Sequence, residues 1–307
     1  MSRYRSVDPP SPNQHSTYRD AHDRDGQHSG RDASRHHDLK DGRAVFARGL
    51  DLPHTEARER VFLKDRDYDL DVSEVRSLAT IGAFRVVDSR DVDATPGARQ
   101  NEIERLRDLK LVEVVTPHVR DSERASLVTL TSEGRDLLEC HRSDPDSPAR
   151  QAYYAGLAKP RQALHDAQLY RAYRDAATAL EGRGARIQRV VLDYELKREY
   201  QRFLQERNRG DRHSSGRPDR TPEEIAEWAV THHLPVDDGH VQFPDVRIEY
   251  EHPDGRPDRE DLELTTEHYS ARQMAGKAAS GFTVVRGSSS TRRGGVPFTP
   301  RAARVLR

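Results

Sequence analysis

Most apolar side chains lie in the middle of the chain, and this limits where a folded core can form. Residues 1–43 are rich in His, Asp, Arg, Ser and Pro and contain almost no aliphatic side chains, while 286–307 contain six arginines and no acid. The first segment cannot bury enough apolar surface to offset the entropy of ordering it, and the arginine-rich, acid-free composition of the second is typical of a mobile basic tail. We therefore predict a disordered N-terminal tail, a flexible basic C-terminal tail, and a folded region between 44 and 285 that is long enough for two domains.

The first part of the folded region, 44–140, alternates between helix and strand signals. Ser73 precedes an apolar stripe and is the expected N-cap of a helix, and Thr95 followed by Pro96 marks the start of another. The predicted elements, in order, are a helix at 73–84, a short helix or turn at 88–93, a helix at 95–111, strands at 112–116 and 126–130, and a helix from 132. Three helices, a hairpin and a further helix follow one another in the order of a winged helix.

A winged helix places its third helix in the major groove of DNA and its hairpin tip against the phosphates. The side chains that could read bases or hold phosphates are Arg99, Gln100, Asn101 and Arg105 on the third helix, with Arg120 and Arg124 at the tip. Basic and acidic residues are equally numerous here, six of each between 95 and 127. A winged helix used for protein contacts, or as a scaffold, therefore remains an alternative.

A segment containing Pro and Ser, 141–159, reads as a linker to a second domain at 160–285. The second domain is predicted to start with one long helix that ends at Gly182 or Gly184. A strand and a helix follow it, and a further helix starts at Thr221, where Pro222 and Glu224 complete a capping box. Two strands joined by a hairpin, a helix and a last short strand complete an α/β domain, so the whole chain is predicted to be α+β.

Two of these strands carry carboxylates in line. Asp245 and Val246 lie on opposite faces of one strand, and Glu263 and Leu262 lie on opposite faces of the partner strand. If the apolar sets share the core, Asp245 and Glu263 project from the same side of the sheet. Two such carboxylates form an oxygen site suited to Mg²⁺, which can polarise a phosphate and activate water. The hairpin is too long to fix the register, and a solvated polar sheet face is the alternative explanation.

This arrangement resembles two related families. Pro244-Asp245 and Glu263-Leu264-Thr265 are similar to the motifs of a PD-(D/E)XK nuclease core. The ordered chain as a whole resembles the replication-relaxation family of plasmids and mobile elements, chiefly in "LHDAQLYRAYRDA" at 164–176 and "LELTTEHYSARQMAGK" at 262–277. The resemblance implies a DNA-binding protein of a plasmid or conjugative element that joins a winged helix to a nuclease-like domain and acts in replication or DNA relaxation.

One position departs from the nuclease pattern, because Thr265 replaces the motif lysine and a hydroxyl cannot supply its positive charge. Lys277, on the predicted following helix, could reach the site, since its side chain is long and flexible, or it could be an ordinary surface lysine. A third carboxylate could come from Glu195, or from Asp166 beside His165. We therefore expect a degenerate nuclease-like site, with an active Mg²⁺-dependent endonuclease and a regulator or protein-interaction adaptor as the alternatives.

Other classes of chemistry leave no signal in the sequence. Cys140 is the single cysteine, so neither a disulfide framework nor a cysteine-based zinc finger is available. There is no glycine-rich phosphate loop, no apolar run of membrane-spanning length and no secretory leader. The expected location is the cytoplasm and the expected partner is double-stranded DNA. A homodimer formed through the helix at 160–180 is a further option, and Tyr153 and Tyr154 are expected to pack rather than to act as nucleophiles.

Overall fold

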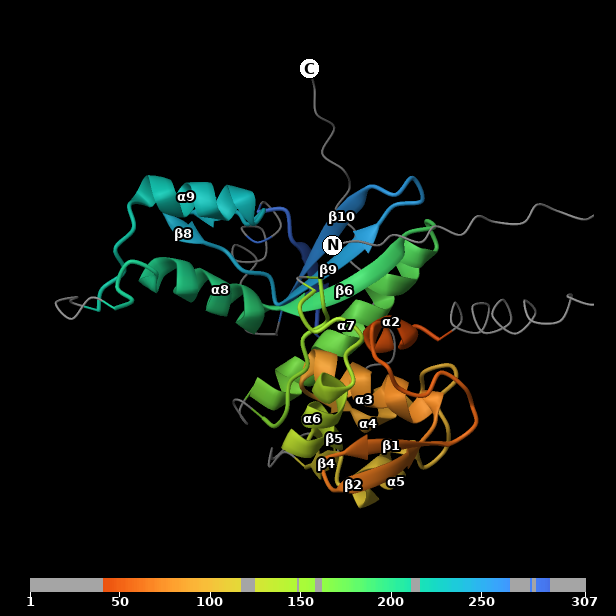
Figure 1. Ribbon diagram of the computed structural model, residues 1–307. Coiled ribbons are helices and arrows are strands. Elements are labelled where there is room, and N and C mark those ends of the chain that lie inside the picture. Colours follow the sequence, from red (N-terminus) through yellow and green to blue (C-terminus); the bar gives the residue numbers. More distant parts are fainter. Residues whose placement is uncertain are drawn as a thin grey trace, which may run out of the picture.

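The computed structural model describes residues 41–116, 125–147, 149–157, 162–210, 216–265, 277 and 280–287. The described chain is a mixed α+β fold with two halves, an N-terminal half at 41–140 and a C-terminal half at 162–287 (Figure 1). Most of both predicted tails lies outside the described residues. The predicted N-terminal tail nevertheless extends too far, because Asp41 and Arg43 are buried and Arg43 is fully enclosed.

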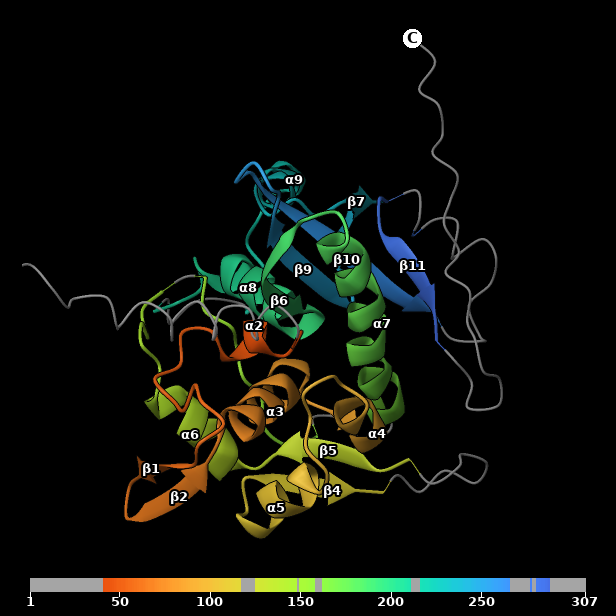
Figure 2. The same cartoon turned by 90° about the vertical axis from the view of Figure 1, so that its right-hand side faces the viewer.

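The N-terminal half combines a β-hairpin with helices and a small sheet. Strands β1 and β2 pair as an antiparallel hairpin, and β3, β5 and β4 form an antiparallel sheet in that order. Helices α3 and α6 pack on the core side of these strands (Figure 2). The elements are α2 (Ala44–Ala47), β1 (Glu59–Leu63), β2 (Arg66–Leu70), α3 (Val72–Phe84), β3 (Val87–Asp88), α4 (Ser89–Asp93), α5 (Glu102–Asp108), β4 (Val112–Val115), β5 (Leu127–Leu130) and α6 (Ser132–Cys140).

Two helix starts differ from the prediction. Asp71, and not Ser73, is the N-cap of α3, because its carboxylate accepts from two backbone N–H groups and Glu74 completes a capping box. The third predicted helix begins at Glu102 rather than at Thr95. The Thr95 hydroxyl instead donates to the carbonyl of Asp91 and so belongs to the end of α4.

The C-terminal half is built on a four-stranded sheet with the order β11-β10-β9-β6. Strands β6, β9 and β10 are antiparallel neighbours, whereas β11 runs parallel to β10. The elements are α7 (Ala163–Glu181), β6 (Arg186–Leu192), α8 (Asp193–Gln205), α9 (Pro222–Thr231), β7 (Val236–Asp237), β8 (His240–Val241), β9 (Val246–Glu251), β10 (Pro257–Thr265) and β11 (Thr283–Arg286). The predicted capping box of α9, formed by Thr221 and Glu224, is confirmed.

Helices cover both faces of this sheet. Helix α7 lies along one face and contacts β6, β9 and β10 (Figure 2). On the other face, Trp228 and Ala229 of α9 and Leu196 of α8 form a separate apolar cluster with Val191 of β6. Helices α8 and α9 extend together to one side of the molecule (Figure 1). Because Arg247 and Glu263 are almost completely buried, the expectation of a solvated polar sheet face is wrong at these two positions.

The two halves share one hydrophobic core. Phe46 and Phe84 of the first half pack against Tyr170 and Tyr173 of α7, with ring centroids 5.1 to 5.4 Å apart for the contacting pairs. The segment predicted as a linker, 141–159, is fixed where the structure describes it. Gln151 exchanges hydrogen bonds with the backbone of Val190 in β6, and the Tyr153 hydroxyl donates to the carbonyl of Phe46. The described halves are therefore packed together as one body.

Candidate functional site

The β9–β10 register brings the two predicted carboxylates to neighbouring positions. The paired ladder ends at Val246 and Leu262, so Asp245 lies one residue before the last pair on β9 and Glu263 one residue after it on β10. The Asp245 N–H donates to the Leu262 carbonyl at 3.0 Å, and the Leu264 N–H donates to Asp245 Oδ2 at 2.8 Å. The side chain of Asp245 is thereby held against β10. The shared face of Asp245 and Glu263 stays a prediction, because the pairing of β9 with β10 ends one residue short of each.

Lys277 lies at this site. Its Nζ atom is 3.1 Å from Glu263 Oε1, and the Glu263 side chain is only 4% exposed. The ammonium also lies 5.3 Å from the ring centroid of Phe282, just before β11. The predicted helix around Lys277 lies outside the described residues, but the lysine itself is not an ordinary surface residue. Thr265, at the motif position, is buried and donates its hydroxyl to the carbonyl of Val285, so it contributes to the sheet.

His165 joins the site from α7. Its Nε2 atom is 3.8 Å from Asp245 Oδ2, and its Nδ1 atom is 3.4 Å from Asp166 Oδ1. Sequence reasoning proposed Asp166 as an additional ligand with His165 only beside it, whereas the structure places His165 against Asp245. Glu195, the other proposed carboxylate, instead accepts from the Tyr154 hydroxyl and lies 3.6 Å from Arg189.

Burial and neighbouring charges act on both titratable groups. Burial raises the pKa of Asp245 above its ordinary value, although the Leu264 N–H, His165 and Lys277 act in the opposite direction. The hydrogen bond to Asp166 is the main cause that raises the pKa of His165; burial opposes it, and the charge of Asp245 adds to it. Both groups therefore bind a proton more readily than their exposed counterparts.

The donor set fits a hard divalent cation only in part. Asp245 and Glu263 offer carboxylate oxygens on neighbouring strands, and Mg²⁺ is commonly held by one or two carboxylates, with waters and substrate phosphates as its other ligands. In the described part of the chain, no group of three or more His, Cys, Asp or Glu side chains is arranged to hold a metal. A metal at this site would therefore depend on the two carboxylates and on the bound phosphate.

The arginines predicted to read DNA are already engaged by carboxylates. Arg99 lies 2.8 Å from Asp71, and Arg105 lies 2.8 Å from Glu74, both at the buried capping box of α3. Each guanidinium is about 40% exposed, at 42% for Arg99 and 39% for Arg105. These residues therefore stabilise the start of α3, and base reading would require an exchange of partners.

The other predicted DNA contacts lie in different surroundings. Gln100 and Asn101 are exposed and precede α5 rather than lying within it, and Asn101 adopts a left-handed backbone with φ of 64°. Arg120 and Arg124 lie outside the described residues. The structure thus places His165 against Asp245 and Lys277 against Glu263, and it holds Arg99 and Arg105 at the start of α3.

Comparisons with other proteins give no independent assignment. No family model matches the chain, and neither the curated proteins nor the solved structures searched gave a match. In the part of the chain that the structure describes, no helix is both long enough and apolar enough to cross a membrane.

Proposed function

We propose that the protein binds DNA and cleaves a phosphodiester bond in a Mg²⁺-dependent reaction at Asp245, Glu263 and Lys277. The observation that carries this proposal is the 3.1 Å contact between Lys277 Nζ and Glu263, beside a carboxylate from the neighbouring strand. Thr265 suggested from sequence that the site had lost its cation. Lys277 supplies that cation from a position later in the chain, which favours a retained site over a degenerate one.

Each residue has a role that follows from its surroundings. Asp245 and Glu263 would hold the metal, which supplies Lewis acidity toward the phosphate and its bound water. Lys277 places a positive charge where negative charge develops on the phosphate oxygens. His165 would orient the Asp245 carboxylate through the 3.8 Å contact between Nε2 and Oδ2.

The N-terminal half is proposed to act as a winged helix that binds duplex DNA. The order of α3, β3, α4, α5, β4 and β5, with a three-stranded antiparallel sheet, supports this assignment. The resemblance to the replication-relaxation family supports a role in plasmid or mobile-element DNA processing. Since Arg99 and Arg105 are held by carboxylates, exposed Gln100 and Asn101 are the better candidates for contacts with base edges.

A nicking assay tests the proposal. Purified full-length protein is incubated with supercoiled plasmid with and without Mg²⁺, and the relaxed form is quantified. We expect nicking only with Mg²⁺, and we expect Asp245→Asn, Glu263→Gln and Lys277→Met each to reduce its rate by about 10²-fold or more. Asp254→Asn, a 66% exposed carboxylate in the β9–β10 turn, is the matched control and should keep wild-type activity.

A second candidate is a DNA-binding protein that does not cleave. It is favoured by the ion pair that already occupies Glu263 and by the use of the Thr265 hydroxyl within the sheet. A duplex gel shift without nicking under any divalent metal would establish this second function and reject the first. No shift with any DNA at low salt would reject both and leave the adaptor, with its self-association through α7, as the function to test.

A further inference from the structure

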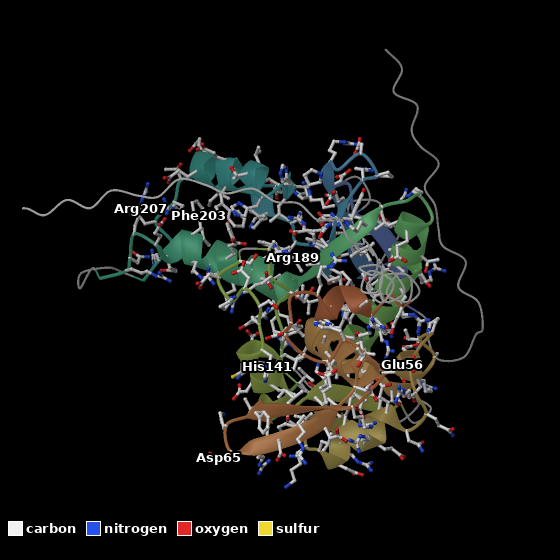
Figure 3. All side chains as sticks on the ribbon, turned by 45° about the vertical axis from the view of Figure 1, so that its right-hand side comes forward. Glu56, Asp65, His141, Arg189, Phe203 and Arg207 are labelled. Carbon is white, nitrogen blue, oxygen red and sulfur yellow. The ribbon has the colours of Figure 1, made fainter. Side chains whose placement is uncertain are left out.

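A basic pocket lies at the junction of the two halves, away from the carboxylates of β9 and β10. The cavity measures about 650 Å³. It is lined by the end of α3, by α6, by the segment at 145–155, and by β6 and α8. Figure 3 shows Arg189 of β6 where the halves meet and His141 at the end of α6 on the other side of the junction. Asp245, Glu263 and Lys277 do not line the pocket.

The wall of this pocket carries more positive than negative charge. Its six arginines are Arg85, Arg135, Arg142, Arg150, Arg189 and Arg198, against the three carboxylates Glu139, Asp146 and Glu195. Three of the arginines are engaged in ion pairs: Arg142 with Glu139, Arg189 with Glu249, and Arg135 with Asp136.

The other three arginines, Arg85, Arg150 and Arg198, have no carboxylate partner among the described residues. Arg150 donates only to the backbone carbonyl of Pro145, and Arg198 lies 5.9 Å from the ring centroid of Tyr194. The guanidinium carbon of Arg85 lies 4.8 Å from the ring centroid of Tyr154 and 4.8 Å from that of Tyr194. The two rings are nearly perpendicular, at 87° with centroids 6.0 Å apart, so they contact the guanidinium from adjoining sides.

The Nε atom of Arg85 is buried and has no hydrogen-bond acceptor in the structure. Buried donors are nearly always paired, so this Nε is an exception, and the other nitrogens of the Arg85 guanidinium are the ones that can meet a ligand in the pocket. Arg85 also has a left-handed backbone, with φ of 66° at the C-terminus of α3. A strained non-glycine residue of this kind is retained where the surroundings require its side chain in one place.

We propose that this pocket binds a phosphate group through Arg85, Arg150 and Arg198. Guanidinium groups match the oxygens of phosphate in geometry and charge. Three guanidinium groups without carboxylate partners suit a doubly charged phosphate ligand better than a ligand with a single carboxylate. The volume leaves room for the rest of a nucleotide. Because both halves supply arginines, the bound phosphate bridges them. The phosphate belongs either to a free nucleotide or to a nucleic-acid backbone.

Binding measurements with three probes test the proposal and separate its two sources. Inorganic phosphate, dAMP and a 20-base-pair duplex are titrated into the full chain at constant ionic strength, and affinity is measured by calorimetry. Arg85→Gln with Arg198→Gln should weaken binding by about tenfold for each guanidinium removed. Arg202→Gln is the control, because Arg202 is an exposed arginine of α8 that does not line the pocket. Arg150→Gln, at an exposed position, provides a variant with little risk to folding.

The outcomes are distinct. Loss of phosphate and dAMP affinity with unchanged duplex affinity assigns the pocket to a free nucleotide, whereas loss of duplex affinity assigns it to a nucleic-acid backbone. Equal affinities of all three probes for the wild type and for both pocket variants would overturn the proposal, as would equal losses in Arg202→Gln. Asp245→Asn should leave phosphate binding unchanged, so failure of the cleavage proposal and failure of this one are separable.

Discussion

Replacement of Arg43 by methionine should cost more stability than replacement of any exposed arginine. The guanidinium is fully buried and donates to Asp41 at 2.9 and 3.0 Å, to Ser77 at 2.6 Å and to Glu102 at 3.3 Å. Methionine keeps much of the volume but leaves two buried carboxylates without this cation. Removal of one partner of a buried ion pair typically costs about 3–5 kcal/mol.

The neighbours of Arg43 place the expected loss at the lower end of that range. Asp41 retains Arg76 at 3.3 Å and the backbone N–H of residue 43, and Glu102 retains the Ser73 hydroxyl at 2.6 Å and the Arg99 N–H at 2.9 Å. We expect a loss of about 3 kcal/mol in the free energy of unfolding. For a chain of this size, that corresponds to a fall of roughly 6–12 °C in Tm.

The loss should also depend on pH. In the wild type, burial raises the pKa of Asp41, but the hydrogen bonds and charge of Arg43 outweigh burial and hold that pKa below its ordinary value. The Asp41 contribution is therefore present above the unfolded pKa and is lost as pH falls through the lower folded pKa. In the variant, burial without Arg43 should raise the pKa of Asp41, so the difference from the wild type should shrink as pH falls below about 5.

Urea unfolding followed by circular dichroism between pH 4 and pH 8 measures both effects. Arg60→Met, at an exposed position of β1, is the control and should stay within about 0.5 kcal/mol of the wild type. A loss below 1 kcal/mol for Arg43→Met at neutral pH would contradict the reasoning. A stability difference between Arg43→Met and the wild type that grows as pH falls would also contradict it, because Asp41 would then not be the buried charge that lost its partner.

Three further predictions concern other parts of the fold. Gly134→Ala should destabilise by about 1–3 kcal/mol in urea unfolding, because the added Cβ would lie 2.1 Å from the Leu111 carbonyl oxygen, whereas Gly42→Ala, with open space around it, should be nearly neutral. The raised pKa of His165 stabilises the fold below the unfolded pKa, and this contribution is lost as pH rises through the folded pKa. The wild type should therefore lose stability as pH rises above about 6.5, and His165→Gln should lack this loss. An unchanged pH profile in the variant would reject this role for His165. Thr221→Ala should cost about 1 kcal/mol by removal of the α9 capping box, and equal midpoints for variant and wild type would contradict it.

Local features of the fold were predictable because their causes are local. The start of α9 follows from Thr221, Pro222 and Glu224 within four positions, and the structure confirms it. The shared face of Asp245 and Glu263 was predicted from alternation along each strand, and it stays a prediction because the β9–β10 pairing ends at Val246 and Leu262. The register itself, set by a hairpin with no short-turn signature, could not be deduced.

The missed features depend on residues that are distant in the sequence. Arg43 was assigned to the tail because its partners Ser77 and Glu102 lie 34 and 59 positions away. Lys277 and His165 reach the site from segments on either side of the two strands, and no local pattern specifies such convergence. The ion pairs of Arg99 and Arg105 were missed for the same reason, because Asp71 and Glu74 belong to a different helix.

The packing of the segment around Gln151 and Tyr153 has a consequence for how DNA would be processed. That segment is bonded to Phe46 on one side and to Val190 on the other, so the two halves have little freedom to swing apart. For a duplex bound by the first half, the distance from the bound sequence to the carboxylates of Asp245 and Glu263 would then be fixed. Breaks should accordingly fall at a constant number of base pairs from the recognised sequence, rather than being scattered as by a tethered, freely rotating nuclease.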